Sequence, residues 1–148
     1  MVTETKQVPS TIEEIVQVAT KGISVEIDQF MEKALRTIKP EMEIEKISDR
    51  LIKIALENID EANPEWTYVA ARIYLQELYR KAGENRKYDR EARYGSLYEL
   101  IQVLTDEGAY APNIISKYTK AEIDHFGNMI DPNRDFLFNY LGIYTVAT

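Results

Sequence analysis

Residues 63–78 read Asn-Pro-Glu-Trp-Thr-Tyr-Val-Ala-Ala-Arg-Ile-Tyr-Leu-Gln-Glu-Leu, and this stretch decides the fold class. Pro64 suits the first turn of a helix, and Asn63 is a residue type that caps helix N-termini. Apolar residues then recur at three- and four-residue steps over a wide arc, which implies contacts with more than one neighbour. The small pair Ala70 and Ala71 lets another helix approach closely. The pattern predicts a central helix in a helical core.

The sequence on both sides of this stretch shows the same helical period and no convincing period-two alternation. Ser10 and Glu13 resemble a capping box that opens a helix, and Thr119 and Glu122 repeat that pattern. We predict helices over about 10–22, 25–38, 43–59, 64–82, 97–108, 119–130 and 134–145, with a short buried turn of helix over 110–118.

The chain has 148 residues, of which 45% are hydrophobic, and this suits one packed domain. We predict a single all-α domain of about seven helices over 11–148, preceded by a flexible tail over 1–10. Residues 83–95 are polar and charged, and they are expected to form a mobile surface loop.

The charge pattern disfavours nucleic-acid binding, because a net charge of -7 repels phosphate backbones. Basic residues gather only at Arg86, Lys87, Arg90 and Arg93, where acids are interspersed, and a solvated loop is favoured there over a phosphate site. The sequence contains no apolar run long enough to span a membrane, and no secretory signal is expected. We therefore expect a cytoplasmic protein.

Few residues offer catalytic chemistry. The chain has no cysteine and a single histidine, His125, so thiolate chemistry and multi-histidine metal sites are excluded. Glu122-x-x-His125 occurs once, whereas a di-metal helical bundle needs that motif twice. The six glycines form no phosphate-binding loop. We predict no catalytic, cofactor-binding or metal-binding residue, and no cofactor in this chain.

The tyrosines and two arginines have structural interpretations. Tyr68, Tyr74, Tyr79, Tyr98, Tyr140 and Tyr144 fit helical patterns, where half-buried rings are common, and this favours packing over redox function. Arg72, and the pair Arg134 and Asp135, can each anchor an interdomain salt bridge or form only a surface ion pair.

Three stretches, in order and with matching spacing, resemble the large subunit of ribonucleotide reductase. Residues 63–73 resemble the family's Pro-(Asp/Glu)-aromatic-x-Tyr-(Leu/Val)-Ala-Ala-Arg-(Leu/Ile) helix. Residues 131–142 resemble its Asp-Arg-Asp-aromatic-x-(Phe/Tyr)-x-Tyr-x-Gly segment, with Pro132-Asn133 as a departure. Leu97-Tyr98-Glu99-Leu100 and Asp106-Glu107-Gly108-Ala109-Tyr110 are similar to a helix and a turn between them. The resemblance covers about 12–147 and implies the family's helical N-terminal domain.

The resemblance implies a role without catalysis in this chain. The family reduces ribonucleotides to deoxyribonucleotides through a cysteine thiyl radical, and its cysteines belong to an α/β barrel that follows this region. A chain without cysteine is not expected to perform that chemistry alone. The expected partners are the catalytic barrel, in the same chain or in trans, and the radical-generating small subunit. The family's activity-controlling ATP-cone is not expected within residues 1–10. No family active-site residue is carried over.

Two other hypotheses remain open. The chain is alternatively a free-standing helical module that binds a partner helix in a groove, or a di-metal helical bundle. If the chain instead joins a barrel in trans, we expect an exposed apolar patch larger than on ordinary monomers. We place that patch on the final helix, at Phe136, Tyr140 and Tyr144.

Overall fold

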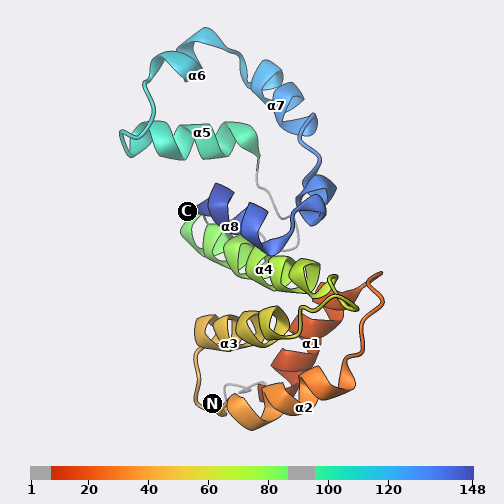
Figure 1. The fold of residues 1–148 in the computed structure, drawn as a ribbon. Helices are drawn as coiled ribbons and strands as arrows, with labels where there is room; N and C mark the ends of the chain where they lie inside the picture. The colour runs from red at the N-terminus through yellow and green to blue at the C-terminus, as the bar shows by residue number, and fades with distance from the viewer. Residues whose placement is uncertain (1–7, 87–95) are drawn as a thin grey trace. The chain divides into compact units, whose positions relative to one another are not determined.

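The computed structural model describes residues 8–86 and 96–148. Within these ranges the chain forms eight α-helices and one 3₁₀ helix and no strand (Figure 1). The elements are α1 (Val8–Thr20), α2 (Asp28–Thr37), α3 (Ile44–Glu57), α4 (Trp66–Arg86), α5 (Leu97–Asp106), α6 (Asn113–Lys117), α7 (Lys120–Asn128), the 3₁₀ helix η2 (Pro132–Leu137) and α8 (Tyr140–Ala147). The predicted all-α class is confirmed. No helix in the described ranges is long and apolar enough to span a bilayer.

The chain divides into two compact units. Unit 1 contains Met1–Glu77 and Asp135–Thr148, and unit 2 contains Leu78–Arg134. The boundary between them falls within α4, so the first half of this helix is counted with unit 1. The single domain expected over 11–148 stays a prediction.

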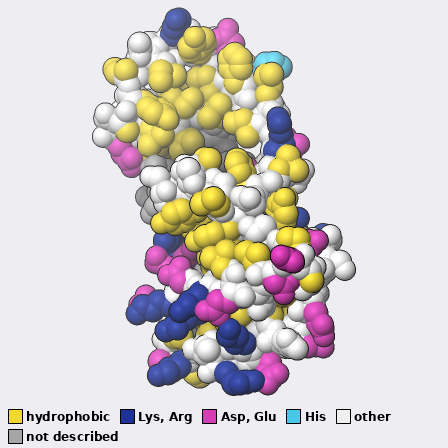
Figure 2. Space-filling model, in the orientation of Figure 1, with side chains coloured by type: hydrophobic (Ala, Val, Ile, Leu, Met, Phe, Trp, Pro, Cys, Tyr) yellow, Lys and Arg dark blue, Asp and Glu magenta, His cyan; other side chains and the backbone are white. Residues whose placement is uncertain are grey.

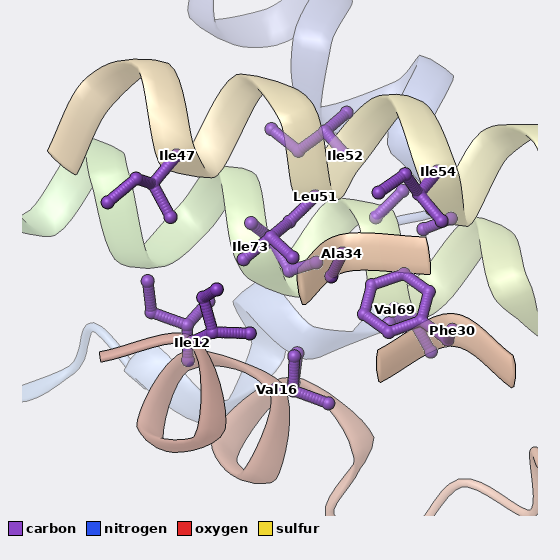
Figure 3. Close-up of a cluster of buried hydrophobic side chains, with 14 of the residues drawn as sticks. Ile12, Val16, Phe30, Ala34, Ile47, Leu51, Ile52, Ile54, Val69 and Ile73 are labelled. Carbon is purple, nitrogen blue, oxygen red and sulfur yellow. The ribbon is translucent and has the colours of Figure 1, made fainter. Parts of the chain in front are cut away.

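The core of unit 1 is formed by α1, α2, α3 and the first half of α4. Figure 3 shows apolar side chains from these four helices pointing toward one another. The largest fully buried side chains are those of Ile12, Phe30, Leu51, Val69 and Ile73. These residues come from the predicted apolar stripes, so the periodicity of the sequence placed the core of this unit correctly.

An aromatic pair closes one part of this core. The rings of Phe30 on α2 and Trp66 on α4 stack with centroids 5.0 Å apart and an interplanar angle of 24°. Both side chains are buried. Stacked aromatic pairs add attraction beyond the area that they bury. This contact therefore fixes the start of α4 against α2.

Unit 2 brings α5 and α7 together through caps and a close approach. In α7 the predicted capping box is confirmed: Thr119 Oγ1 accepts from the Glu122 N–H at 3.2 Å, and the Glu122 carboxylate accepts from the Thr119 N–H at 3.1 Å. Gly127 faces α5 so closely that an added Cβ would lie 3.0 Å from the Cβ of Leu97. Glycine thus permits the packing of these two helices.

The first two helices begin at other residues than the sequence indicates. α1 begins at Val8, so Ser10 lies inside its first turn and the predicted capping box does not open this helix. Residues 1–7 lie outside the described part, and the flexible tail expected over 1–10 stays a prediction. α2 begins at Asp28, about one turn of helix later than predicted.

The central helix is also shifted. α4 begins at Trp66, and Asn63 does not show the predicted cap. Instead, the backbone and side-chain N–H groups of Asn63 donate to Asp60 Oδ1 at 2.7 Å and 3.1 Å. This turn satisfies the polar groups before the helix. At its other end α4 continues to Arg86, so the first residues of the loop predicted over 83–95 are helical, and 87–95 lie outside the described residues.

The C-terminal third departs most from prediction. The short helix α6 contains no buried residue, and Tyr110 and Tyr118 beside it are exposed, so the expected buried turn is wrong. The single helix expected over 134–145 is divided into η2 and α8. Asn139 causes the division, because its side chain accepts from the Gly142 N–H at 2.8 Å and caps a new helix.

Candidate functional site at the junction of two motifs

Two sequence motifs that lie about 70 residues apart meet in unit 1. The N–H of Tyr140, at the start of α8, donates to Thr67 Oγ1 on α4 at 3.2 Å. One turn further along α4, the Arg72 guanidinium lies over the Phe136 ring, 5.3 Å from its centroid. Figure 1 shows α8 running beside α4. We call this contact the motif junction, formed by Thr67, Arg72 and Tyr74 of α4 with Phe136 and Tyr140.

Arg72 connects three parts of unit 1. Its Nη1 donates to the backbone oxygen of Lys21, just after α1, at 2.7 Å, while its guanidinium covers Phe136. Its Nε is buried and has no hydrogen-bond partner, and burial lowers the pKa of the guanidinium from its usual value. A cation held against a ring and a carbonyl therefore ties the end of α1 and the 3₁₀ helix to α4.

Replacing Arg72 with alanine is expected to lower the free energy of unfolding by about 1–2 kcal/mol, because it removes a charge-assisted hydrogen bond and a cation–π contact. Arg72→Lys is expected to recover only part of the lost free energy of unfolding, since an ammonium lacks the planar face that stacks on a ring. Urea unfolding followed by circular dichroism measures the loss. Arg36→Ala is the control, because Arg36 is an exposed helix residue paired only with Glu32. Equal losses for both variants would contradict the role given to Arg72.

A cluster of three tyrosines fills the other side of the junction. Tyr74 lies edge-on to Tyr140 with centroids 6.0 Å apart, and Tyr144 lies 5.9 Å from Tyr74 and 5.8 Å from Tyr140. Desolvation by burial, and then the neighbouring Tyr144, Tyr74 and Asp49, raise the pKa of the Tyr140 hydroxyl. These contacts agree with the packing role expected for these tyrosines.

Alkaline pH is expected to weaken unit 1 through Tyr140. Because folding raises the pKa of this hydroxyl above its ordinary value of 10.0, the folded state favours the neutral phenol. That contribution is complete below the unfolded pKa and is lost as pH rises through the folded pKa. We expect the melting temperature of the wild type to fall more steeply than that of Tyr140→Phe above about pH 10. Tyr68→Phe, an exposed position on α4, is expected to keep the wild-type slope, and identical slopes for all three proteins would refute the assignment.

The residues of the Glu122-x-x-His125 motif have other roles in the structure. The Glu122 carboxylate serves the capping box of α7, while His125 is exposed near the end of that helix beside the Phe126 ring. Within residues 8–86 and 96–148 no group of three or more acidic or histidine side chains lies close enough to hold a metal ion. Of the basic cluster, Lys87, Arg90 and Arg93 lie outside the described residues.

Sequence reasoning identified Arg72 and Tyr140 but not all their partners. Thr67 and the Lys21 carbonyl gave no signal as partners, because a hydroxyl and a backbone oxygen are too common in sequence to stand out. Arg134 is exposed, and the interdomain salt bridge or surface ion pair suggested for Arg134 and Asp135 stays a prediction. Phe136 and Tyr140 are half-buried in the junction, so the patch expected on the final helix has Tyr144 as its exposed member.

A shallow groove lies between α1 and α2 in unit 1. Its volume is about 510 Å³, and it is lined by Val16, Ile27, Met31 and Leu35 together with Glu13, Gln17 and Thr20. Helical ligands dock an apolar face into such grooves. The groove gives the helix-binding alternative a location, and that alternative stays a prediction.

Comparison with known proteins gives the chain its relatives. No family model matches the sequence. The chain is 33% identical to the ribonucleoside-diphosphate reductase subunit alpha of Helicobacter pylori over 102 residues, which is 69% of this chain and 12% of that protein. The chain is a relative of an N-terminal region of this alpha subunit. The alpha subunit of enterobacteria phage T4 is 29% identical over 139 residues, 90% of this chain, and that of Escherichia coli is 28% identical over 102 residues.

The alpha subunits are much longer than this chain, and this limits what the sequence similarity shows about it. The chain spans only 12% of the Helicobacter pylori and Escherichia coli alpha subunits and 17% of the phage T4 alpha subunit. These relatives support the resemblance drawn from residues 63–73 and 131–142. The structure adds that these two stretches contact each other, so the motifs share one packing site within unit 1.

Proposed function

We propose that this chain is the N-terminal, non-catalytic part of a ribonucleoside-diphosphate reductase large subunit, and that it packs on the catalytic portion of that enzyme. The observation that carries the proposal is the similarity to alpha subunits several times longer than the matched region. The reaction would convert ribonucleotides to deoxyribonucleotides for DNA synthesis, with the radical supplied by a small subunit.

The division of labour follows from the side chains. The reduction needs thiols, and this chain has no cysteine. Its contribution is therefore shape: the core of α1–α4 and the motif junction form a packed unit that can support a neighbouring catalytic domain. Rigid supporting elements matter in catalysis because small displacements of reacting groups cost large factors in rate.

A reconstitution experiment tests this proposal. The catalytic portion of the alpha subunit from the same genome is produced as a separate chain, and nucleoside diphosphate reduction is measured with the small subunit present. We expect no reduction by this chain alone and a complex with the catalytic portion, whose reductase activity rises when the chain is added. A catalytic portion that neither binds this chain nor changes in activity would overturn the proposal.

The matched control uses the same assay with the core broken. Leu51→Asp puts a charge into a fully buried position and is expected to unfold unit 1. This variant should then give no complex and no gain in activity. Stimulation by the unfolded variant would show that the gain does not come from the folded domain.

A further inference from the structure

We propose that the apolar side chains of α5, α6 and α7 form a docking face for the catalytic portion of the alpha subunit, and that the partner surface has an apolar centre and a basic margin. The proposal rests on the proposed function and adds to it the surface through which the two parts join. We call this surface, together with the exposed Met129 and Ile130 just after α7, the α5–α7 face.

Burial sets this part of the chain apart. Among residues 96–134 the only buried side chain is that of Ile123. The helices α5 and α6 contain no buried residue, although α5 carries Leu97, Leu100, Ile101 and Leu104 at helical spacing. A helix with such a stripe normally buries it against a neighbour. The described helices of unit 2 therefore have an apolar stripe that their own packing leaves partly open.

The exposed apolar residues of unit 2 are large. Phe126 lies in the last turn of α7, and Met129 and Ile130 lie just after the helix, three and four residues beyond Phe126. All three are exposed, as are Tyr110 and Tyr118. Figure 2 shows hydrophobic side chains gathered over the part of the molecule that α5, α6 and α7 occupy in Figure 1. Contiguous apolar patches of this kind mark interaction surfaces.

The length of the relatives indicates the occupant. The match to the phage T4 alpha subunit spans 139 residues and 90% of this chain, so too few residues remain unmatched to leave out α5–α7. In that protein the matched region is 17% of the chain, and the remainder supplies ample surface to cover an apolar face. The same remainder, the catalytic portion, is the partner that the proposed function requires.

Charge argues against a second copy as the occupant. Residues 96–134 contain six acids, Glu99, Asp106, Glu107, Glu122, Asp124 and Asp131, and only three bases, Lys117, Lys120 and Arg134. Two copies docked through this face would bring like charges together, whereas a basic margin on a different partner would be attracted. The repulsion between like charges therefore disfavours self-association through this face.

The exposed side of α8 is a weaker choice for the same role. Leu141 and Val146 of α8 are exposed, as is Leu137 at the end of η2. However, α8 already packs on α4 through the ring contacts of Tyr140, and its Ile143 is buried. Unit 1 has its own core of sixteen buried residues. Residues 96–134 have no comparable core, so they leave more apolar surface for a partner to bury.

Four single substitutions to aspartate distinguish the α5–α7 face from the exposed surfaces of α1 and α8. Met129 (70% exposed) and Ile130 (51%) lie at the α5–α7 face, while Val18 (52%) on α1 and Leu141 (71%) on α8 are matched controls of similar exposure. Binding to the catalytic portion is measured by titration calorimetry after circular dichroism has verified the helix content of each variant. We expect Met129→Asp and Ile130→Asp to raise Kd about tenfold or more, and the two controls to change it less than about threefold.

Hydrogen exchange of the wild type gives a readout that needs no variant. On addition of the catalytic portion, amides of α5 and α7 should gain protection while those of α1–α3 stay unchanged. Wild-type binding with unaffected Met129→Asp and Ile130→Asp variants, or protection confined to α8, would overturn the inference and leave the proposed function standing. A wild type that does not bind overturns both. A dimer of the chain alone that Met129→Asp dissociates would assign the face to a second copy and also overturn the inference.

Discussion

Phe30→Ala is expected to lower the free energy of unfolding of this chain by about 3–5 kcal/mol, the range for truncating a buried aromatic side chain. Phe30 is 1% exposed, stacks on Trp66 at 5.0 Å and belongs to the core that joins α1–α4. Truncation removes the packing contacts of the ring. It also leaves a cavity that cannot collapse, because the surrounding helices are fixed by their other contacts. Because small domains have about 5–15 kcal/mol of stability, this loss would be a large fraction of it.

Urea unfolding measured by circular dichroism, with tryptophan fluorescence as a second probe, tests this expectation. Trp66 is the only tryptophan, so its emission reports on the neighbourhood of Phe30 directly. Val18→Ala, at an exposed position of α1, is the control and is expected to change stability by less than about 0.5 kcal/mol. A Phe30→Ala loss no larger than that of the control would mean that the ring is not in the core.

Ala70→Glu is expected to abolish cooperative folding of unit 1. Ala70 is fully buried on α4, and its neighbour Ala71, about 100° further around the helix, is fully buried as well. A glutamate at position 70 adds volume where none is free and places a carboxylate in an apolar core. Uncompensated buried charge costs several kcal/mol, and overpacking adds about 1–3 kcal/mol.

The same substitution on an exposed helix face provides the matched control. Ala121 is exposed in the first turn of α7, where an acid is favourable because of the helix dipole. Ala121→Glu is therefore expected to keep the wild-type urea midpoint, whereas Ala70→Glu should show reduced helix content without denaturant. A cooperative transition of Ala70→Glu near the wild-type midpoint would disprove close packing at this position.

Periodicity predicted the helices well where a helix has a one-sided apolar stripe and a strong stop. α3 and α5 match the expected ranges closely, and Gly22 and Gly108 follow their helices with φ of +76° and +79°, a conformation that favours glycine. Prediction failed where a polar side chain could either lie within a continuous helix or cap a new one. Asn139 caps α8 and divides a helix that the apolar pattern presents as continuous.

The motif junction was only half accessible from sequence. The small pair Ala70 and Ala71 indicated close packing, and both side chains are fully buried. For Arg72 the sequence suggested a salt bridge or a surface ion pair, whereas its described contacts are the Lys21 carbonyl and the Phe136 ring. That Arg72 would meet Phe136 depends on the path of the chain after α7, which no local pattern specifies. Contacts between segments far apart in sequence follow from tertiary packing, and helical spacing alone cannot pair them.

The uneven distribution of buried side chains also bears on how the protein opens. Local opening of a segment costs roughly what its buried contacts supply, and residues 96–134 contribute a single buried apolar side chain while α1–α4 contribute a continuous core. We therefore expect α5–α7 to open locally much more often than α1–α4. With so little buried surface, the segment can adjust its shape when it meets a rigid surface.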